Sequence, residues 1–207
     1  MRKTILDLPI FLVGAKPSAA FTAATTDIIT SNAHGLSEGD CVTVSSTTTL
    51  PAGLSASTNY YVRDVTTNTF KVSATKGGAV VDITDAGTGT HTYLLRGKKI
   101  LVQDFNNVLL SMGTASSAAF VIKFQGSTQE NVDFNAAASS TNRWDYIQVK
   151  DYQNNAAIDG NTGITYSGTD ANRVLEFNIS GLTCVTAIIS SYTAGNINLL
   201  ASLYANE

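Results

Sequence analysis

The sequence predicts an all-β fold, with a jelly-roll-like β-sandwich as the main domain and a smaller β-sandwich or barrel module. Two observations favour this class. Short runs of alternating apolar and polar residues recur at a spacing of roughly 8–12 residues, bounded by Gly, Asn, Asp and Ser. Helical periodicity is almost absent. With 207 residues, 43% of them hydrophobic, the chain can bury the core of one large β domain or two small ones.

The first predicted strands fall in the amino-terminal half. A basic pair precedes an apolar run that predicts a strand over residues 4–13. Residues 41–44 alternate, and 60–65 and 70–72 flank a turn. Residues 80–83 and 91–95 are joined by Asp85-Ala86-Gly87-Thr88-Gly89, which has the composition of a hairpin turn.

Longer strands are predicted in the second half. Phe120, Ile122 and Phe124 share one face of a strand, because side chains alternate between faces. The same spacing recurs from Leu175 to Ile179. Further strands are expected at 144–149, 183–190 and 197–203. Trp144 alternates within its run, so we expect it in the core.

Three segments divide the chain. Residues 1–18 form an amino-terminal strand or arm, 19–95 a small Thr/Gly-rich module, and 98–207 the main sandwich. The polar run Arg96-Gly97-Lys98-Lys99 breaks the strand pattern and marks the second boundary. An alternative is that the module is inserted near the start of the sandwich, which would make residues 4–14 a strand of that sandwich.

Charge and cysteine content limit the partners. Charged residues make up 14% of the chain, against roughly 25% in typical domains. The net charge is −3 and there is no basic stripe, so we expect no nucleic-acid partner. Cys41 and Cys184 lie far apart in apolar patterns and are expected to be free, buried thiols.

The amino-terminal segment resembles a signal peptide only in part. Arg2 and Lys3 precede the apolar run, but Asp7 and Pro9 interrupt it, so we expect no cleaved signal. No segment reaches the roughly 18 apolar residues of a membrane-spanning helix, so no membrane association is expected.

Residues suited to catalysis or metal binding are few. His34 and His91 are the two histidines, and neither lies in a metal-binding or nucleophile motif. Residues 159–163 have the look of a calcium loop but lack its full set of oxygen ligands, which favours a hairpin turn. We therefore expect no enzyme activity, no catalytic residues, no cofactor and no metal site.

Tyrosines offer the more informative candidates. Six of them fall in or beside predicted strands, where they could belong to the core, a protein interface or a sugar-stacking platform. They are Tyr60, Tyr61, Tyr146, Tyr152, Tyr166 and Tyr192.

Six short motifs occur in a fixed order in the first block: 34–40 (HGLSEGD), 50–54 (LPAGL), 60–62 (YYV), 68–73 (NTFKVS), 77–82 (GGAVVD) and 85–91 (DAGTGTH). With these motifs the block resembles a small β module of tailed-bacteriophage structural and tail-associated proteins. The second block is similar to uncharacterised phage virion proteins at 142–149 (NRWDYIQV), 157–163 (AIDGNTG) and 192–195 (YTAG).

These resemblances imply a non-enzymatic structural component of a phage particle, made in the host cytoplasm and located in the virion. A capsid-surface decoration or cement protein is the leading hypothesis. The alternatives are a tail, baseplate or fibre component and a carbohydrate-binding adhesin, the latter with a host-surface glycan as partner.

The expected partners are copies of the chain itself, preferably in a trimer, and other phage structural proteins such as the major capsid protein. We expect the assembly interface to include Ile10, Phe11 and Leu12, in an arm laid along a neighbour's strand edge, with Tyr60 and Tyr61. Each buried apolar side chain would contribute about 1.5–3 kcal/mol.

Overall fold

The computed structural model describes residues 2–11, 17–103, 105–114, 119–167, 173–195 and 197–206. Within these ranges the regular structure consists of strands, without a helix, which confirms the all-β class. No helix in the described part of the chain is long and apolar enough to cross a membrane. The chain divides into a larger unit, residues 1–16 and 97–207, and a smaller unit, residues 17–96.

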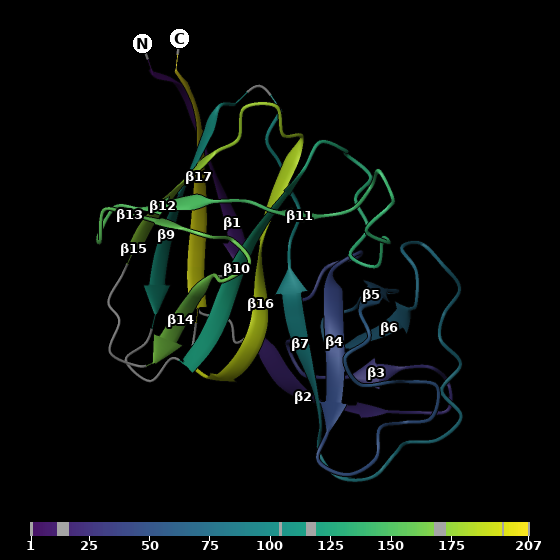
Figure 1. The fold of residues 1–207 in the computed structure, drawn as a ribbon. Coiled ribbons are helices and arrows are strands. Elements are labelled where there is room, and N and C mark those ends of the chain that lie inside the picture. Colours follow the sequence, from purple (N-terminus) through teal and green to yellow (C-terminus); the bar gives the residue numbers. More distant parts are fainter. Residues whose placement is uncertain are drawn as a thin grey trace. The chain divides into compact units, whose positions relative to one another are not determined.

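The smaller unit is a closed barrel with strand order β2-β3-β6-β5-β4-β7, closed by the pairing of β2 with β7 (Figure 1). Its strands are β2 (Ser18–Ala23), β3 (Ile29–Thr30), β4 (Cys41–Ser46), β5 (Tyr60–Arg63), β6 (Thr69–Ser73) and β7 (His91–Gly97). Closure removes the exposed edges of the sheet.

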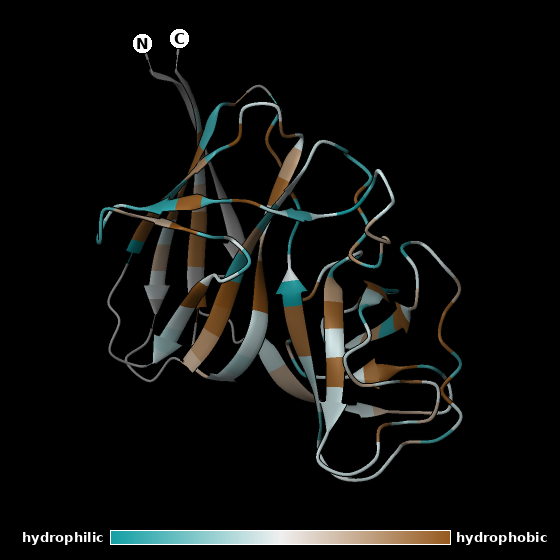
Figure 2. Ribbon diagram, in the orientation of Figure 1, coloured by the Kyte–Doolittle hydropathy of each residue, from teal (hydrophilic) through white to brown (hydrophobic). Residues whose placement is uncertain are grey.

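Side chains that point inward at every second position fill the interior of the barrel. In β7, buried and half-buried residues follow each other in strict alternation. The inward ring of Tyr93 meets that of Phe70 edge-to-face, with centroids 5.8 Å apart. Figure 2 shows the corresponding apolar colouring on the strands of this unit.

The larger unit contains two antiparallel sheets (Figure 1). One has the order β1-β17-β9-β15-β12-β13, and the other β11-β10-β16-β8, with β14 paired to β10. The strands of the first sheet are β1 (Arg2–Phe11), β9 (Asn107–Thr114), β12 (Val149–Asp151), β13 (Ala156–Ile158), β15 (Arg173–Asn178) and β17 (Ile197–Asn206). Those of the second are β8 (Ile100–Leu101), β10 (Ala119–Ser127), β11 (Asp145–Tyr146), β14 (Ile164–Ser167) and β16 (Cys184–Ala194).

The core of the larger unit lies between these two sheets. The rings of Phe124 in β10 and Phe177 in β15 meet at 5.4 Å, so the sheets contact each other through their apolar faces. Val108, Leu110 and Met112 alternate along β9 and are fully buried. The intervening residues of β9 therefore point to the outer face of the first sheet.

Several strands differ from the sequence prediction. Residues 80–83 form only an isolated bridge between Val80 and Ser73. The expected strand at 144–149 is interrupted: β11 pairs with β10 and β12 with β15, in different sheets. The short strands β3, β8, β13 and β14 were not predicted, because two to four residues give too little alternation to recognise. The longer strands β2 and β9 were also missed, since small alanines in β2 and the outward Leu109 in β9 disturb the apolar alternation.

Trp144 is a second correction. It lies just before β11, is only half-buried, and stacks on Phe134 with ring centroids 5.4 Å apart. The alternation that predicted a core position came from residues that the chain distributes between two sheets.

Candidate functional site

Tyr60 and Tyr61, which were predicted to take part in an assembly interface, lie buried in the smaller unit. Each is 3% exposed, in β5 of the barrel. The Tyr60 hydroxyl accepts a hydrogen bond from the Ser55 backbone N–H at 2.9 Å. Adjacent residues of a barrel strand point to opposite faces, so one of the two tyrosines faces the interior and the other is covered by chain outside the sheet. The bond to Ser55 shows that the loop before β5 contacts Tyr60.

The expected arm residues lie at one edge of the first sheet. Ile10 and Phe11 belong to β1, whose backbone pairs antiparallel with β17 of the same chain. Leu12 lies outside the described residues. The backbone hydrogen-bond ladder that was expected between this segment and a neighbouring molecule is formed here with β17 of the same chain, along one side of β1.

Both histidines hold loops of the barrel in place. His34 Nδ1 accepts a hydrogen bond from the Leu36 backbone N–H at 3.0 Å. The Nε2 atom of His91 lies 3.0 Å from the Ala86 carbonyl oxygen, and its Nδ1 lies 3.0 Å from Ser46 Oγ. The phage-like motif thus contributes turns and hydrogen bonds that shape the barrel.

The loop at residues 159–163 is a turn. Asp159 Oδ1 accepts hydrogen bonds from the backbone N–H groups of Asn161 at 2.7 Å and Thr162 at 3.1 Å. Gly163 has φ of +68°, and its Cα approaches β10 so closely that a Cβ would lie 2.1 Å from the Ile122 carbonyl oxygen. Among the described residues, no group of three or more His, Cys, Asp or Glu side chains could hold a metal ion.

The remaining tyrosines separate into buried and exposed ones. Tyr166 is buried and stacks on Phe120 at 4.7 Å, and Tyr192 is half-buried, its hydroxyl donating to the Gly195 carbonyl at 2.7 Å. Tyr146 and Tyr152 are 45% and 47% exposed. Among the described residues of the larger unit, these two are the exposed large aromatic side chains.

The outer face of the first sheet carries an apolar patch around Tyr152. Val174 is 44% exposed, and its carbonyl accepts a hydrogen bond from the Tyr152 backbone N–H. Cross-strand register aligns Val174 with Ser111 of β9 and Leu200 of β17. We name Leu109, Tyr152, Val174 and Leu200 the outer patch. Each is next in sequence to a buried residue, namely Leu110, Asp151, Leu175 and Ala201.

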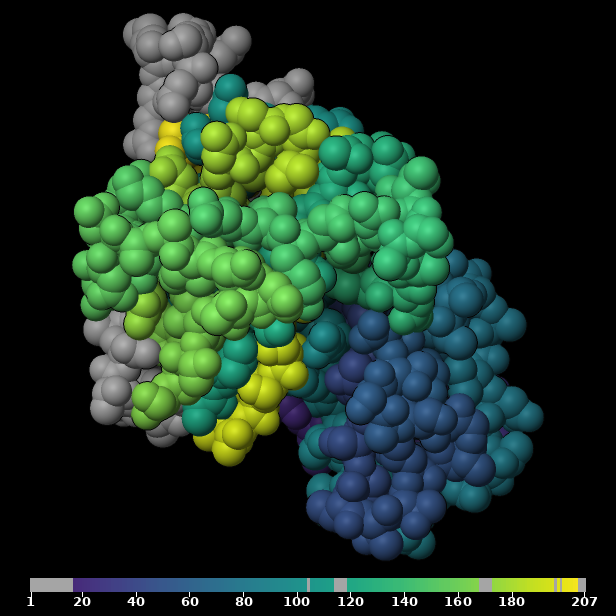
Figure 3. Space-filling model, in the orientation of Figure 1, coloured from purple at the N-terminus to yellow at the C-terminus, as the bar shows by residue number. Residues whose placement is uncertain are grey.

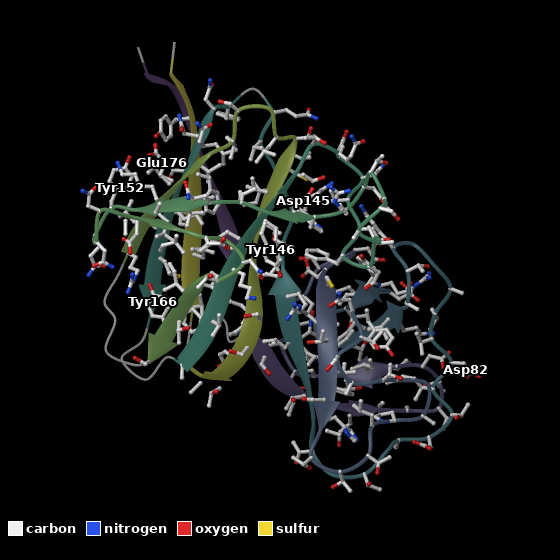
Figure 4. All side chains as sticks on the ribbon, viewed as in Figure 1. Asp82, Asp145, Tyr146, Tyr152, Tyr166 and Glu176 are labelled. Atoms are coloured by element: carbon white, nitrogen blue, oxygen red, sulfur yellow. The ribbon has the colours of Figure 1, made fainter. Side chains whose placement is uncertain are left out.

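A carboxylate with two phenolic partners borders this patch. Glu176 Oε2 accepts a hydrogen bond from the Tyr152 hydroxyl at 2.5 Å, and its Oε1 accepts one from the Tyr204 hydroxyl. Lys150 lies opposite Glu176 in the register, with its Nζ 4.7 Å from the centroid of the Tyr152 ring. We call these four residues the Glu176 cluster; Figure 4 shows Tyr152 beside Glu176, with Tyr146 apart from them.

Hydrogen bonding controls the protonation of this cluster. Partial burial raises the pKa of Glu176, but the bonds from Tyr152 and Tyr204 and the Lys150 charge outweigh it and lower that pKa below its ordinary value. The same hydrogen bond to Glu176 raises the pKa of Tyr152. At neutral pH the Glu176 side chain is therefore a carboxylate and the Tyr152 side chain a neutral phenol.

Beside the cluster, β12, β13 and β15 enclose a hollow of about 330 Å³. Its lining includes Lys150, Glu176 and Asn178, together with Gln148, Val149, Asn155, Ala156 and Ala157. Figure 3 shows the β12–β13 segment, in green, at the surface of the larger unit. The outer patch, the Glu176 cluster and the hollow thus share one face of one sheet.

A buried ion pair, Asp151 with Arg173, lies on the core side of the same sheet. Asp151 is fully buried, and its Oδ2 lies 2.7 Å from Arg173 Nη1 and 2.9 Å from Asn154 Nδ2. The Gln153 backbone N–H donates to its Oδ1 at 2.9 Å. Burial raises the pKa of Asp151, but these hydrogen bonds and Arg173 together hold it below the ordinary value.

Sequence analysis named Tyr152 but missed Lys150, Glu176 and Tyr204. Glu176 sits between two core residues, Leu175 and Phe177, and such a lone charge on the polar side of a strand is common. Lys150 and Tyr204 reach Glu176 only through strand pairing: β12 pairs with β15, and Tyr204 lies on β17, on the other side of β9. These residues are more than 20 positions from Glu176 in the sequence, so the sequence pattern alone could not bring them together.

Comparison with known proteins gives little further guidance. No family model matches the chain, and no curated protein matches it. Among solved structures, the crystal structure of the SPBc2 prophage-derived protein YomS is similar at 17% identity, over 53% of this chain and 80% of that one. The TM-score is 0.39.

Proposed function

We propose that the chain is a non-enzymatic structural component of a tailed-bacteriophage particle, and that its larger unit is a jelly roll that contacts neighbouring subunits. The observation that carries this proposal is the outer patch. It places a tyrosine, a valine and two leucines on the solvent side of a sheet whose other side already packs on the core. Apolar residues gathered on an outer face are typical of protein interfaces.

Strand pairing supports the jelly-roll proposal. Counted along the larger unit, eight strands nest as first with last (β1·β17), second with seventh (β8·β16), third with sixth (β9·β15) and fourth with fifth (β10·β14). The pairing of β17 with β9 joins the first and third of these pairs into one sheet, and the pairing of β16 with β10 joins the second and fourth into the other. A long hairpin of eight strands rolled into two sheets has this order, and viral capsid and lectin domains use it.

The two remaining parts are insertions in this scheme. The barrel lies between the first and second strands, and β11 to β13 lie between the fourth and fifth. The barrel contains the sequence motif that resembles phage structural proteins. The hydrogen bonds of the two histidines in this motif hold the loops of the barrel in place. We infer that it acts as a rigid spacer or contact module.

Within the particle, the proposed position is the capsid surface, where the chain would act as a decoration or cement protein. Its partners would be copies of itself, as a trimer, and the major capsid protein. A low charged fraction favours close packing of like copies, because repulsion between them is small. A position in the tail, baseplate or fibre is the second candidate.

Quantitative mass spectrometry of purified particles of the encoding phage tests both positions. A decoration protein is expected at a copy number comparable to that of the major capsid protein. A copy number far below that value would favour the tail assignment. Absence from particles, with the chain present in the infected cell, would contradict the structural role itself.

A further inference from the structure

The hollow beside the Glu176 cluster has features that a protein contact does not require. Ala157 of β13 pairs with Lys150 of β12, shares its face of the sheet, and lines the floor of the hollow with a short side chain. Small residues between long ones leave a depression on an otherwise continuous sheet. Its volume, about 330 Å³, lies at the lower end of the range for small-molecule sites, roughly 300–1,000 Å³.

The groups around this floor both donate and accept hydrogen bonds. Gln148, Asn155 and Asn178 contribute amides, each with an N–H₂ donor and a carbonyl acceptor. Lys150 adds a donor and Glu176 an acceptor. This mixture of donors and acceptors suits a ligand that carries hydroxyl groups, because a hydroxyl both donates and accepts hydrogen bonds.

Charge in the hollow is balanced. Lys150 and Glu176 lie directly opposite each other across β12 and β15, so their formal charges cancel. The carboxylate is oriented by the hydroxyls of Tyr152 and Tyr204 and is therefore held in place before any ligand arrives. A net anion or cation would gain little here over a neutral, polar ligand.

We propose that this hollow binds a neutral sugar residue of a glycan chain, with the amides donating and accepting hydrogen bonds and the Glu176 carboxylate accepting them from the sugar hydroxyls. Tyr152 donates a hydrogen bond to Glu176, which lines the hollow. Its exposed ring therefore offers apolar surface to an adjoining sugar. This site does not depend on the position of the chain in the particle.

The test uses the full chain on a printed array of bacterial-surface oligosaccharides, both neutral and acidic, followed by calorimetric titration of the strongest neutral ligand. Wild-type protein is expected to bind oligosaccharides built from neutral hexoses or N-acetylhexosamines. Ala157→Trp, which fills the hollow, is expected to weaken binding by about tenfold or more. Gln148→Ala, which removes one amide, is expected to weaken it less.

A matched control exists on the second sheet. Tyr146 is exposed to the same degree as Tyr152 and has a lysine, Lys123, with Nζ 5.5 Å from its ring centroid. Tyr146→Ala and Lys123→Ala should therefore leave sugar binding unchanged, with thermal unfolding confirming that all variants fold. Three results would overturn the proposal: no neutral ligand on the array, a preference for acidic glycans, or unchanged affinity in a folded Ala157→Trp protein.

Discussion

At the scale of single residues, the buried ion pair between Asp151 and Arg173 has the largest predicted effect. Asp151 is fully buried and has four hydrogen bonds from Gln153, Asn154 and Arg173. Asp151→Ala leaves the Arg173 charge without its carboxylate, and we expect the free energy of unfolding to fall by about 3–5 kcal/mol. Urea denaturation followed by circular dichroism measures this.

A surface pair provides the control. Asp145 accepts a hydrogen bond from Arg143 Nε at 2.8 Å, but both side chains are largely exposed. Asp145→Ala should therefore cost less than about 1 kcal/mol. Equal losses for the two variants would contradict the assignment of Asp151 to a buried network.

The same carboxylate predicts how stability depends on pH. The pKa of Asp151 in the folded chain lies below its unfolded value, which is about 3.9. Its contribution is therefore fully present above that value and is lost as the pH falls through the folded pKa. The difference in urea midpoint between wild type and Asp151→Asn should be constant near neutral pH and should shrink under acid conditions below about pH 4. A difference that grew on acidification would have the wrong sign.

Thiol reactivity tests the burial of both cysteines. Cys41 and Cys184 are free and at most 1% exposed, and Cys184 Sγ donates to the Gln129 carbonyl at 3.2 Å. We expect slow reaction with a thiol reagent in the native state and rapid reaction in urea, because a buried thiol is shielded from the reagent. Rapid native labelling would contradict the placement of β4 and β16.

At the scale of elements, the turn before β14 depends on one glycine. In Gly163→Ala, a Cβ would meet the Ile122 carbonyl oxygen at 2.1 Å while φ is +68°, so both strain and a backbone clash arise. We expect a loss of at least about 3 kcal/mol. Gly181→Ala separates the two effects: its φ is +85°, but nothing lies within 4 Å, so about 1–2 kcal/mol is expected. Thermal unfolding of both variants measures the difference.

Several individual strands were predictable from alternation, but β2 and β9 were missed although they have six and eight residues. The sequence located β10, β15 and β16, whose inward residues are large and apolar. It could not resolve 144–149, because the break between β11 and β12 occurs where the chain changes sheets, and local alternation continues through that break. The burial of both Tyr60 and Tyr61 was equally hidden, since alternation along β5 does not show that chain outside the sheet covers its outer face.

At the scale of the whole molecule, the outer patch predicts self-association. Val174→Asp places a charge on the patch without disturbing the core, so stability should change by no more than about 0.5 kcal/mol. We expect the variant to lose the trimer, as measured by light scattering after size-exclusion chromatography. Leu101→Asp is the control, because Leu101 is exposed to the same degree but lies on β8 of the other sheet. Equal association of the Val174 variant and wild type would contradict the interface.

The candidate site itself was beyond sequence analysis because it is assembled by register. Lys150, Glu176 and Tyr204 come from three strands that are not consecutive along the chain. Nothing in their local sequence distinguishes them from solvent-facing residues. The nested pairing of first with last strand is equally hidden, since residues 2–11 carry no mark of their partner near the other end.

That nesting has a consequence for synthesis on the ribosome. Strand β1 emerges first, but its partner β17 is the last strand to be made, whereas every pairing that closes the barrel lies within residues 17–96. Chains grow at about 5–20 residues per second, and units fold as they are completed. The barrel can therefore fold before β1 has a partner, and the larger unit can complete its first sheet only after β17 has left the exit tunnel. A chaperone that shields extended apolar segments would act on β1 during that interval.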